Sequence, residues 1–357
     1  LRYLINPLNT VYALGRIATQ PLRMDTRTLL PFGRDAHLGA SYAGQTKPPL
    51  LVLVVGETGR SGNFGLNGYA RATTPQLSAR NDLASASNAW ACGTSTATAL
   101  PCMFSGLGKN DYEARKSNHE NLLDVLDHAG LAVLWLDNQS GCKGVCDRVP
   151  SASTTTSPDP TWCKGGECLD PIMLEGLDAR LAALPEEKRA RGTVLVLHQM
   201  GSHGPAYARR SAPELKKFTP ECHSNALQEC SQEEVVNAYD NSIVQTDAFL
   251  GATLHWLEGK QAEFQPAMIY VADHGESLGE NNIYLHGLPY AIAPDVQKHV
   301  PWITWLSPAM QARSGASTAC LQKEMATRRI SQDDYFHSVL GLLNVQTTTY
   351  QAANDLF

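Results

Sequence analysis

The clearest hydrophobic pattern in the chain is a run of six aliphatic residues at positions 50–55, which stops at Gly56. Six residues are too few to cross a bilayer, and a run rich in valine and leucine favours a strand buried on both faces. Runs of similar character and helical patterns follow in alternation. This alternation predicts an α/β fold, specifically an α/β/α sandwich around a mainly parallel sheet. The expected strands are 50–55, 131–136, 193–197, 267–272 and 302–306, and the expected helices are 120–128, 171–183 and 233–256.

The remaining segments show little periodicity. Residues 1–48 contain one short amphipathic pattern, at 9–19, and then a stretch that is typical of a linker. Residues 150–160 form a Ser/Thr/Pro-rich segment, and 205–234 are expected to be a long irregular insertion. We therefore expect a connector at 1–48 and one large domain at 49–357.

Composition limits the classes of function. The chain has 357 residues, of which 43% are hydrophobic, enough for a sizeable core. Its net charge is -6, and no basic stripe interleaved with aromatic residues occurs, so nucleic acid is not expected as a partner. No apolar run approaches the roughly 20 residues of a membrane span. A first residue that is not Met suggests a processed or truncated chain.

The nine cysteines lie mostly in close pairs. Such pairs can be metal knuckles in a reducing compartment or short disulfides in an oxidising one. The spacings do not repeat the rhythm of a zinc ribbon, and the pairs lie in loop-like sequence, so we favour disulfides and a periplasmic or extracellular location. The pairs are Cys92 with Cys102, Cys142 with Cys146, Cys163 with Cys168, and Cys222 with Cys230, which leaves Cys320 over.

Polar side chains gather directly after the predicted strands, where open α/β sheets bind their ligands. Three ionisable residues within four positions after a strand, as in Asp-His-Gly-Glu at 273–276, indicate function. Carboxylates and histidines together suit Zn²⁺. His198, in register with its strand, is instead expected to be a buried, hydrogen-bonded residue. The candidates are Glu57 after the first strand, Gln139, Ser140 and Lys143 after the second, His203 after the third, and Asp273, His274 and His286 after the fourth.

A nucleophile is suggested by the run 91–105, where small hydroxyl residues crowd between Cys92 and Cys102. A Thr or Ser at the start of a short helix there would face free backbone N–H groups that suit a phosphate. The alternative is a Ser/Thr-rich surface turn. Spacing alone leaves Thr94, Ser95, Thr96 and Thr98 open as candidates.

Several stretches together resemble one family, the zinc-dependent phosphoethanolamine transferases of Gram-negative inner membranes, which include the mobile colistin-resistance enzymes. The matching stretches cover nearly the whole chain in order: INPLN, LVLVVGETGRSGNFGLNGYARATTPQL, CGTSTATALPCMFS, DNQSGCKGVCDRVP, LHQMGSHGPAY, KFTPEC, NAYDNSI and ADHGESLGENNIYLHGLPYAIAP. The resemblance implies an alkaline phosphatase/sulfatase-like fold. It also implies that transmembrane helices precede this chain, that 1–48 is the tail of a linker, and that 49–357 is a periplasmic catalytic domain.

The resemblance also implies roles for the candidates. Glu57, Thr96, Asp273 and His274 would hold a catalytic Zn²⁺, with Thr96 as the nucleophile. Lys143, His203 and His286 would line the phosphoethanolamine site, and the two histidines would be candidates for holding a second zinc. Gln139 and Ser140 fall where the family contacts the substrate headgroup. The close cysteine pairs match family disulfides, whereas Cys320 matches nothing in the family pattern.

The implied reaction is a two-step displacement. Thr96 would take phosphoethanolamine from phosphatidylethanolamine, and a lipid A phosphate would then accept it, which confers polymyxin (colistin) resistance in the family. The nearest rival is a phosphatase or sulfatase of the same fold, because the acceptor is not set by the fold. The rival of another class is a non-catalytic zinc-binding or lipid-sensing periplasmic module.

Overall fold

An eight-stranded sheet forms the centre of the molecule, which is described here from a computed structural model over residues 25–357. The expected helix at 9–19 lies outside the described residues. The sheet order is β15-β4-β14-β11-β3-β10-β6-β7, and only the pairings of β14 with β11 and β4 are antiparallel. The prediction of a mainly parallel sheet is confirmed. The strands are β3 Pro49–Gly56, β4 Leu83–Trp90, β6 Ala132–Asp137, β7 Ser151–Ser153, β10 Thr193–His198, β11 Gln265–Ala272, β14 His299–Leu306 and β15 Ile330–Ser331.

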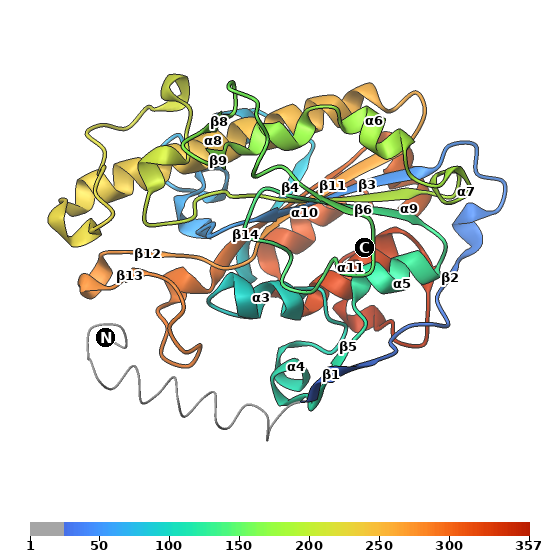
Figure 1. Ribbon diagram of the computed structural model, residues 1–357. Coiled ribbons are helices and arrows are strands. Elements are labelled where there is room, and N and C mark those ends of the chain that lie inside the picture. Colours follow the sequence, from blue (N-terminus) through green and yellow to red (C-terminus); the bar gives the residue numbers. More distant parts are fainter. Residues whose placement is uncertain (1–24) are drawn as a thin grey trace.

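Helices cover both faces of this sheet (Figure 1). The alternation of side chains along β3 explains why two cores form. Leu50, Val52 and Val54 pack on one side with α2 Pro75–Ser78, α6 Leu177–Ala182 and α8 Gln232–Gly259. Leu51, Leu53 and Val55 pack on the other side, together with residues from five helices. These are α3 Thr96–Met103, α5 Leu122–His128, α9 Pro308–Ser314, α10 Thr318–Thr327 and α11 Asp333–Leu342.

Two predicted helices begin at capping residues. The side chain of Asn121 accepts a hydrogen bond from Leu123 N, and α5 begins at Leu122. Ser231 and Glu234 form a capping box at the start of α8. The helix expected at 171–183 is wrong as a single element. It is a 3-10 helix, Asp170–Leu174, followed by α6, because Gly176 adopts a left-handed conformation (φ 64°) between them.

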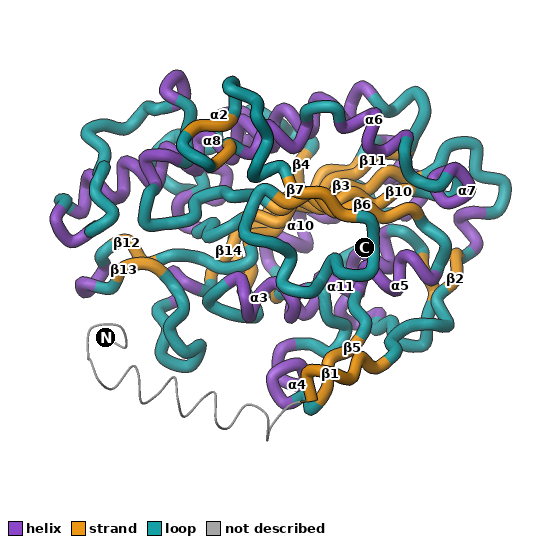
Figure 2. The backbone as a smooth tube through the Cα atoms, viewed as in Figure 1, coloured by secondary structure: helices purple, strands orange, loops and turns teal. Residues whose placement is uncertain are grey.

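Small strand pairs and two short helices complete the fold. β1 Asp25–Leu30 pairs with β5 Ser117–His119 beside α4 Lys109–Ala114, apart from the main sheet (Figure 2). Thus part of the segment expected to be a connector packs on the domain. The domain boundary at 48/49 stays a prediction. The other elements are β2 His37–Leu38 with β16 Val345–Gln346, β8 Cys163–Lys164 with β9 Glu167–Cys168, β12 Ser277–Leu278 with β13 Tyr284–Leu285, and α7 Glu186–Arg189.

The eight paired cysteines form the four disulfides expected from their spacing, so the metal-knuckle alternative does not hold for them. Their Cα atoms are 4.0 to 6.1 Å apart, within the usual range or just below it. Cys320 is exposed and free. Among the residues described, no helix has the length and apolarity that a membrane crossing requires.

Candidate active site

The site forms where β3 and β11, neighbours in the sheet, end side by side. Glu57 directly follows β3 and Asp273 directly follows β11, and Asp273 N donates to Gly56 O. Gly56 has to be a glycine, because a Cβ at this position would lie 2.5 Å from the hydroxyl of Tyr270. Parallel pairing of the two strands therefore brings two carboxylates that are distant in sequence to one edge of the sheet.

Three ionisable groups converge at this edge. Glu57, Asp273 and His274 each offer a ligand atom, all within 4.8 Å of one another, and all three side chains are fully buried. Nε2 of His274 lies 3.4 Å from Oε1 of Glu57 and 3.5 Å from Oδ2 of Asp273. Nδ1 of His274 lies 2.8 Å from Gly275 O, and a proton on Nδ1 leaves the lone pair of Nε2 facing the carboxylates.

Thr96 joins this cluster from α3, a helix that packs on one face of the sheet. It is the first residue of α3, and its hydroxyl donates to Oε2 of Glu57 over 2.9 Å and lies 3.3 Å from Nε2 of His274. The other three candidate hydroxyls are engaged elsewhere. Thr94 donates to Leu288 O, and Ser95 donates to the exposed Thr98. Of the four candidate hydroxyls, Thr96 is thus the one in contact with Glu57 and His274, and its role as the nucleophile stays a prediction.

The electrostatics of the cluster show an excess of negative charge. Burial opposes the charged form of His274, but the carboxylates of Asp273 and Glu57 outweigh it and raise its pKa to about 10. Burial and the charge of Glu57 raise the pKa of Asp273 to about 6. For Glu57, burial is outweighed by His274, and its pKa is lowered.

A cation fits this donor set. Oε1 of Glu57 and Oδ2 of Asp273 are buried and have no hydrogen-bond partner among the described residues. Two carboxylate oxygens, a hydroxyl and Nε2 of His274, where a cation would replace the proton, are ligand types that Zn²⁺ accepts. Buried polar atoms normally have partners, so these oxygens indicate that the site is built for a positive charge.

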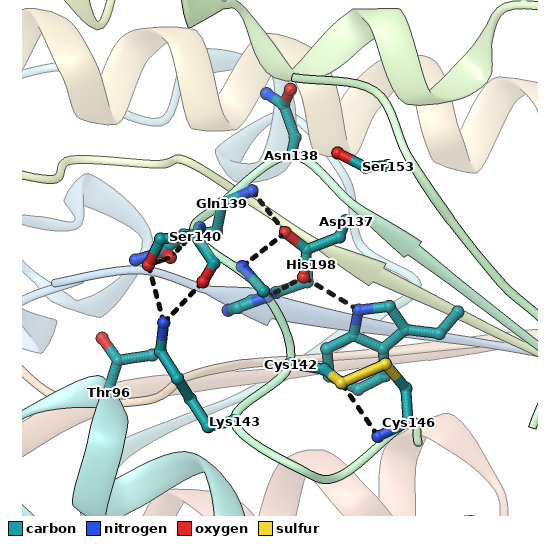
Figure 3. A network of polar contacts seen from close by, with 12 residues as sticks. Thr96, Asp137, Asn138, Gln139, Ser140, Cys142, Lys143, Cys146, Ser153 and His198 are labelled. Carbon is teal, nitrogen blue, oxygen red and sulfur yellow. Dashed lines mark hydrogen bonds and ion pairs between the residues drawn. A yellow bond between two sulfur atoms is a disulfide. The ribbon is translucent and has the colours of Figure 1, made fainter. Parts of the chain in front are cut away.

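The residues predicted after the second strand form a chain of contacts that begins at Glu57. Nε2 of Gln139 donates to Oε2 of Glu57 over 2.8 Å, and the hydroxyl of Ser140 donates to Gln139. Lys143 Nζ donates in turn to the carbonyl and hydroxyl oxygens of Ser140, at 2.8 and 2.6 Å (Figure 3). A cleft of about 540 Å³ lies beside them, lined by Gln139, Ser140 and Lys143.

His203 and His286 lie close to the cluster but outside the metal-capable group. The rings of His286 and His274 are 4.4 Å apart between centroids, and those of His203 and His286 are 6.0 Å apart. Nδ1 of His286 lies 3.0 Å from Oε1 of Glu276. Burial lowers the pKa of His203. Within residues 25–357, neither histidine joins a group of three or more potential ligands, so the second zinc stays a prediction.

Sequence reasoning missed the groups that hold these loops. His198 is buried as expected, and its partner is Asp137, whose Oδ2 lies 2.9 Å from Nδ1 (Figure 3). Asp170 accepts hydrogen bonds from the backbone of Met200 and Gly201 and so fixes the loop that carries His203. Asp137 ends its strand, a position that could have drawn attention to it. Asp170 lies beside a predicted helix and gave no such signal.

Comparison with known proteins agrees with this geometry. Residues 49–345 match the family model described as Sulfatase, the class of protein that the fold and the metal-capable cluster define. The solved soluble domain of lipooligosaccharide phosphoethanolamine transferase A from Neisseria meningitidis is 40% identical, with a TM-score of 0.85, over 92% of this chain and 97% of that one. The chain therefore belongs to the phosphoethanolamine transferases of the sulfatase family.

Two longer relatives show how much of such a protein this chain represents. Phosphoethanolamine transferase EptA of Salmonella typhimurium (strain LT2) is 43% identical over 359 residues, which cover 99% of this chain and 63% of that protein. The integral membrane protein lipooligosaccharide phosphoethanolamine transferase A from Neisseria meningitidis has a TM-score of 0.92 and 39% identity, covering 99% of this chain and 65% of that one. The chain thus spans less than two thirds of the length of these relatives.

Proposed function

We propose that the protein transfers phosphoethanolamine from phosphatidylethanolamine to a lipid A phosphate through a covalent intermediate on Thr96. The observation that carries the proposal is the position of the Thr96 hydroxyl, which is buried against Glu57 and His274. The family relationship supports the same reaction, since the similar solved domain is described as a lipooligosaccharide phosphoethanolamine transferase.

Glu57, Thr96, Asp273 and His274 would hold Zn²⁺ as the cofactor. The ion would supply positive charge that favours the ionised form of the Thr96 hydroxyl and balances charge on the phosphoryl group. Gln139 holds Oε2 of Glu57, which leaves Oε1 free for coordination. His203 and His286 remain candidates for a second zinc.

The protein's own residues would carry out the transfer in two steps. In the first, Thr96 Oγ1 forms a bond to the phosphorus of the donor, the bond from phosphorus to the glycerol oxygen breaks, and diacylglycerol leaves with a proton. In the second, an oxygen of the acceptor phosphate attacks the same phosphorus, the bond from phosphorus to Thr96 Oγ1 breaks, and Thr96 Oγ1 takes up a proton. His203, whose pKa is lowered by burial, and His286 would move these protons, while Lys143 would face the phosphoryl oxygens.

The same inference extends to location and phenotype. Four disulfides support an oxidising compartment, and the similar integral membrane protein supports attachment to a membrane through a preceding domain. We place residues 49–357 in the periplasm as the catalytic domain, tethered to the bacterial inner membrane, with 1–48 as the linker. Attaching an amine to lipid A phosphates would weaken the attraction of cationic polymyxins to the cell surface, giving colistin resistance.

Intact-mass analysis with a phosphatidylethanolamine analogue tests the covalent step. With zinc present, the wild-type chain should gain one phosphoethanolamine group, located on Thr96 by peptide mapping. Thr96→Ala should gain none. Thr98→Ala is the matched control, because Thr98 is an exposed residue of the same helix and should not affect the adduct. An unmodified wild-type chain would refute the mechanism and leave the non-catalytic zinc-binding module. An adduct that persists in Thr96→Ala would instead show that another residue is the nucleophile.

The acceptor distinguishes a transferase from a hydrolase of the same fold. The isolated adduct should be stable in buffer and should disappear when lipid A is added, with phosphoethanolamine appearing on the lipid. If the adduct decays equally fast without lipid A, water is the acceptor and the protein is a phosphatase.

A further inference from the structure

A second cleft begins one residue away from Thr96, on the side of α3 that faces β1 and β5. It has a volume of about 400 Å³, within the range of small-ligand sites, and it is lined by Ala97 and Pro101 of α3 and by Lys143. Ala97 and Pro101 are four residues apart and so share one helical face. Lys143 lines both this cleft and the one beside Gln139, so the two clefts adjoin at this side chain.

Two cations in the cleft lack a carboxylate partner among the described residues. Arg115 directly follows α4, and among the described residues its guanidinium donates only to the carbonyl and hydroxyl oxygens of Tyr112, at 2.6 and 2.9 Å. The guanidinium also lies 3.5 Å from the centre of the Tyr112 ring. Lys143 donates to Ser140. Neither forms an ion pair with any residue between 25 and 357.

The neighbouring charges are accounted for differently. Arg148 also lines the cleft, but Asp124 neutralises it through two contacts, at 2.6 and 2.7 Å. Glu120 accepts bonds from Arg34 and from Phe32 N. Asp147 is an exposed carboxylate that also lines the cleft. Among the described residues of the lining, the two unpaired cations, Arg115 and Lys143, therefore exceed the unpaired carboxylate by one positive charge.

The rest of the lining is polar and suited to hydroxyl groups. Tyr112, Ser105 and Asn118 contribute side chains to it, and Nδ1 of the half-buried His119 has no hydrogen-bond partner in the described part of the chain. Leu29 lies in the lining too and is 40% exposed. β1, β5 and α4 lie together here at one edge of the molecule (Figure 2). An anionic, hydroxyl-rich ligand with an apolar tail has the complementary chemistry.

We propose that this cleft binds the phosphorylated sugar headgroup of the acceptor, with Arg115 as the anchor for its anionic substituent. The proposal rests on the proposed transferase function, which supplies a phosphorylated glycolipid as the acceptor. Ala97 and Lys143 place the cleft beside the Thr96 adduct, so a sugar seated in it would have a phosphate within reach of the reacting phosphorus. The forked guanidinium of Arg115 suits a phosphate better than an ammonium does.

Direct binding tests the site without any turnover. Glucose 1-phosphate is titrated into the zinc-loaded chain by calorimetry, with glucose and inorganic phosphate as separate probes. We expect the sugar phosphate to bind more tightly than either, and Arg115→Gln to weaken it by about tenfold, the loss typical of one charged hydrogen-bonding partner. Lys116→Gln is the matched control, since Lys116 is the adjacent exposed cation and does not line the cleft. Equal affinities of Arg115→Gln and Lys116→Gln would overturn the proposal.

Arg115→Lys is the control for a folding defect, because it keeps the positive charge but loses the forked guanidinium. Its affinity for the sugar phosphate should lie between those of the wild type and Arg115→Gln. Turnover provides the second readout. With lipid A as acceptor, Arg115→Gln should raise the acceptor KM by about tenfold and change kcat less. If the Thr96 adduct never forms, the proposed function fails, but calorimetry still decides whether the cleft binds a sugar phosphate. If the adduct forms and the acceptor KM is unchanged, only the cleft assignment fails.

Discussion

His274 forms hydrogen-bonding contacts with its two neighbours in sequence. Its backbone N–H donates to Oδ1 of Asp273 over 2.7 Å, and its ring Nδ1 contacts Gly275 O. Both contacts are local in sequence, and together they favour one orientation of the ring. Gly275 tolerates no side chain, since a Cβ there would lie 2.0 Å from Val296 O. The Asp-His-Gly sequence and the segment around Val296 together set the geometry of Nε2.

A different histidine gives a prediction for stability against pH. His337 in α11 is buried, accepts a hydrogen bond from Gln351 N at 3.2 Å through Nδ1, and burial lowers its pKa from 6.5 to about 4. Between these values the unfolded state binds the proton and the folded state does not, so stability should fall as pH drops from about 6.5 to about 4. His337→Asn keeps an acceptor but cannot titrate, and it should remove on the order of 1–3 kcal/mol of this dependence.

Urea unfolding of both chains across that pH range is the measurement. Other groups titrate in the same window, so the difference between the two curves carries the prediction rather than either curve alone. Parallel curves for wild type and His337→Asn would show that His337 does not contribute.

The clustering of ionisable residues was predictable from the sequence where they follow strand ends, as for Glu57, Asp273 and His274. Pattern alone did not single out Thr96, because its neighbours in the run carry the same hydroxyl group. The contact of Gln139 with Glu57 also could not be predicted, because it joins loops 82 residues apart. The resemblance implies a headgroup contact for Gln139, which stays a prediction, and in the structure its amide group donates to Glu57.

At the scale of elements, aliphatic runs predicted the central strands of the sheet but not β4, which lies next to the edge strand. β4 reads LASASNAW, which has small and polar residues in place of an aliphatic run, yet it pairs with β14. Tertiary pairing overrides weak local preference here. Capping residues mark the starts of α5 and α8, which lie close to the predicted ones. The helices after residue 306 were not predicted, although Ser307 and Ser317 cap α9 and α10.

The loop after β10 gives a prediction at this scale. Gly201 has a φ of 49°, and a Cβ there would lie 2.8 Å from Glu57 O and 3.0 Å from Glu57 N. Gly201→Ala should therefore cost about 1 kcal/mol for the backbone conformation and more for displacing Glu57. Gly44→Ala is the control, because Gly44 has a φ of 68° and a Cβ there would have no atom of the described residues within 4 Å.

Urea unfolding measures both costs, and zinc content after dialysis reports on Glu57. We expect Gly201→Ala to be the less stable variant and to retain less zinc, whereas Gly44→Ala should retain the wild-type amount. Equal losses of stability with equal zinc content would mean that the loop adjusts without moving Glu57.

At the scale of the whole molecule, the proposed ligands join parts of the chain that are far apart in sequence. Glu57 follows β3, Thr96 begins α3 on one face of the sheet, and Asp273 and His274 follow β11. An unfolded chain cannot present these four groups together, so a cation that binds them stabilises only the folded state. Zinc at about a hundred times its dissociation constant would add about 2.7 kcal/mol to the free energy of unfolding.

Thermal unfolding with and without a chelator tests this coupling independently of catalysis. Removal of zinc should lower the Tm by several degrees, and added Zn²⁺ should restore it. Asp273→Asn should lose most of the zinc-dependent shift, because it removes one negative charge from the cluster. Asp295→Asn provides the control, since Asp295 is an exposed carboxylate whose side chain pairs with Lys298 and is not one of the proposed ligands. A zinc-dependent shift of the same size in Asp273→Asn would place the stabilising ion elsewhere, and no shift in the wild-type chain would mean that these residues do not hold zinc.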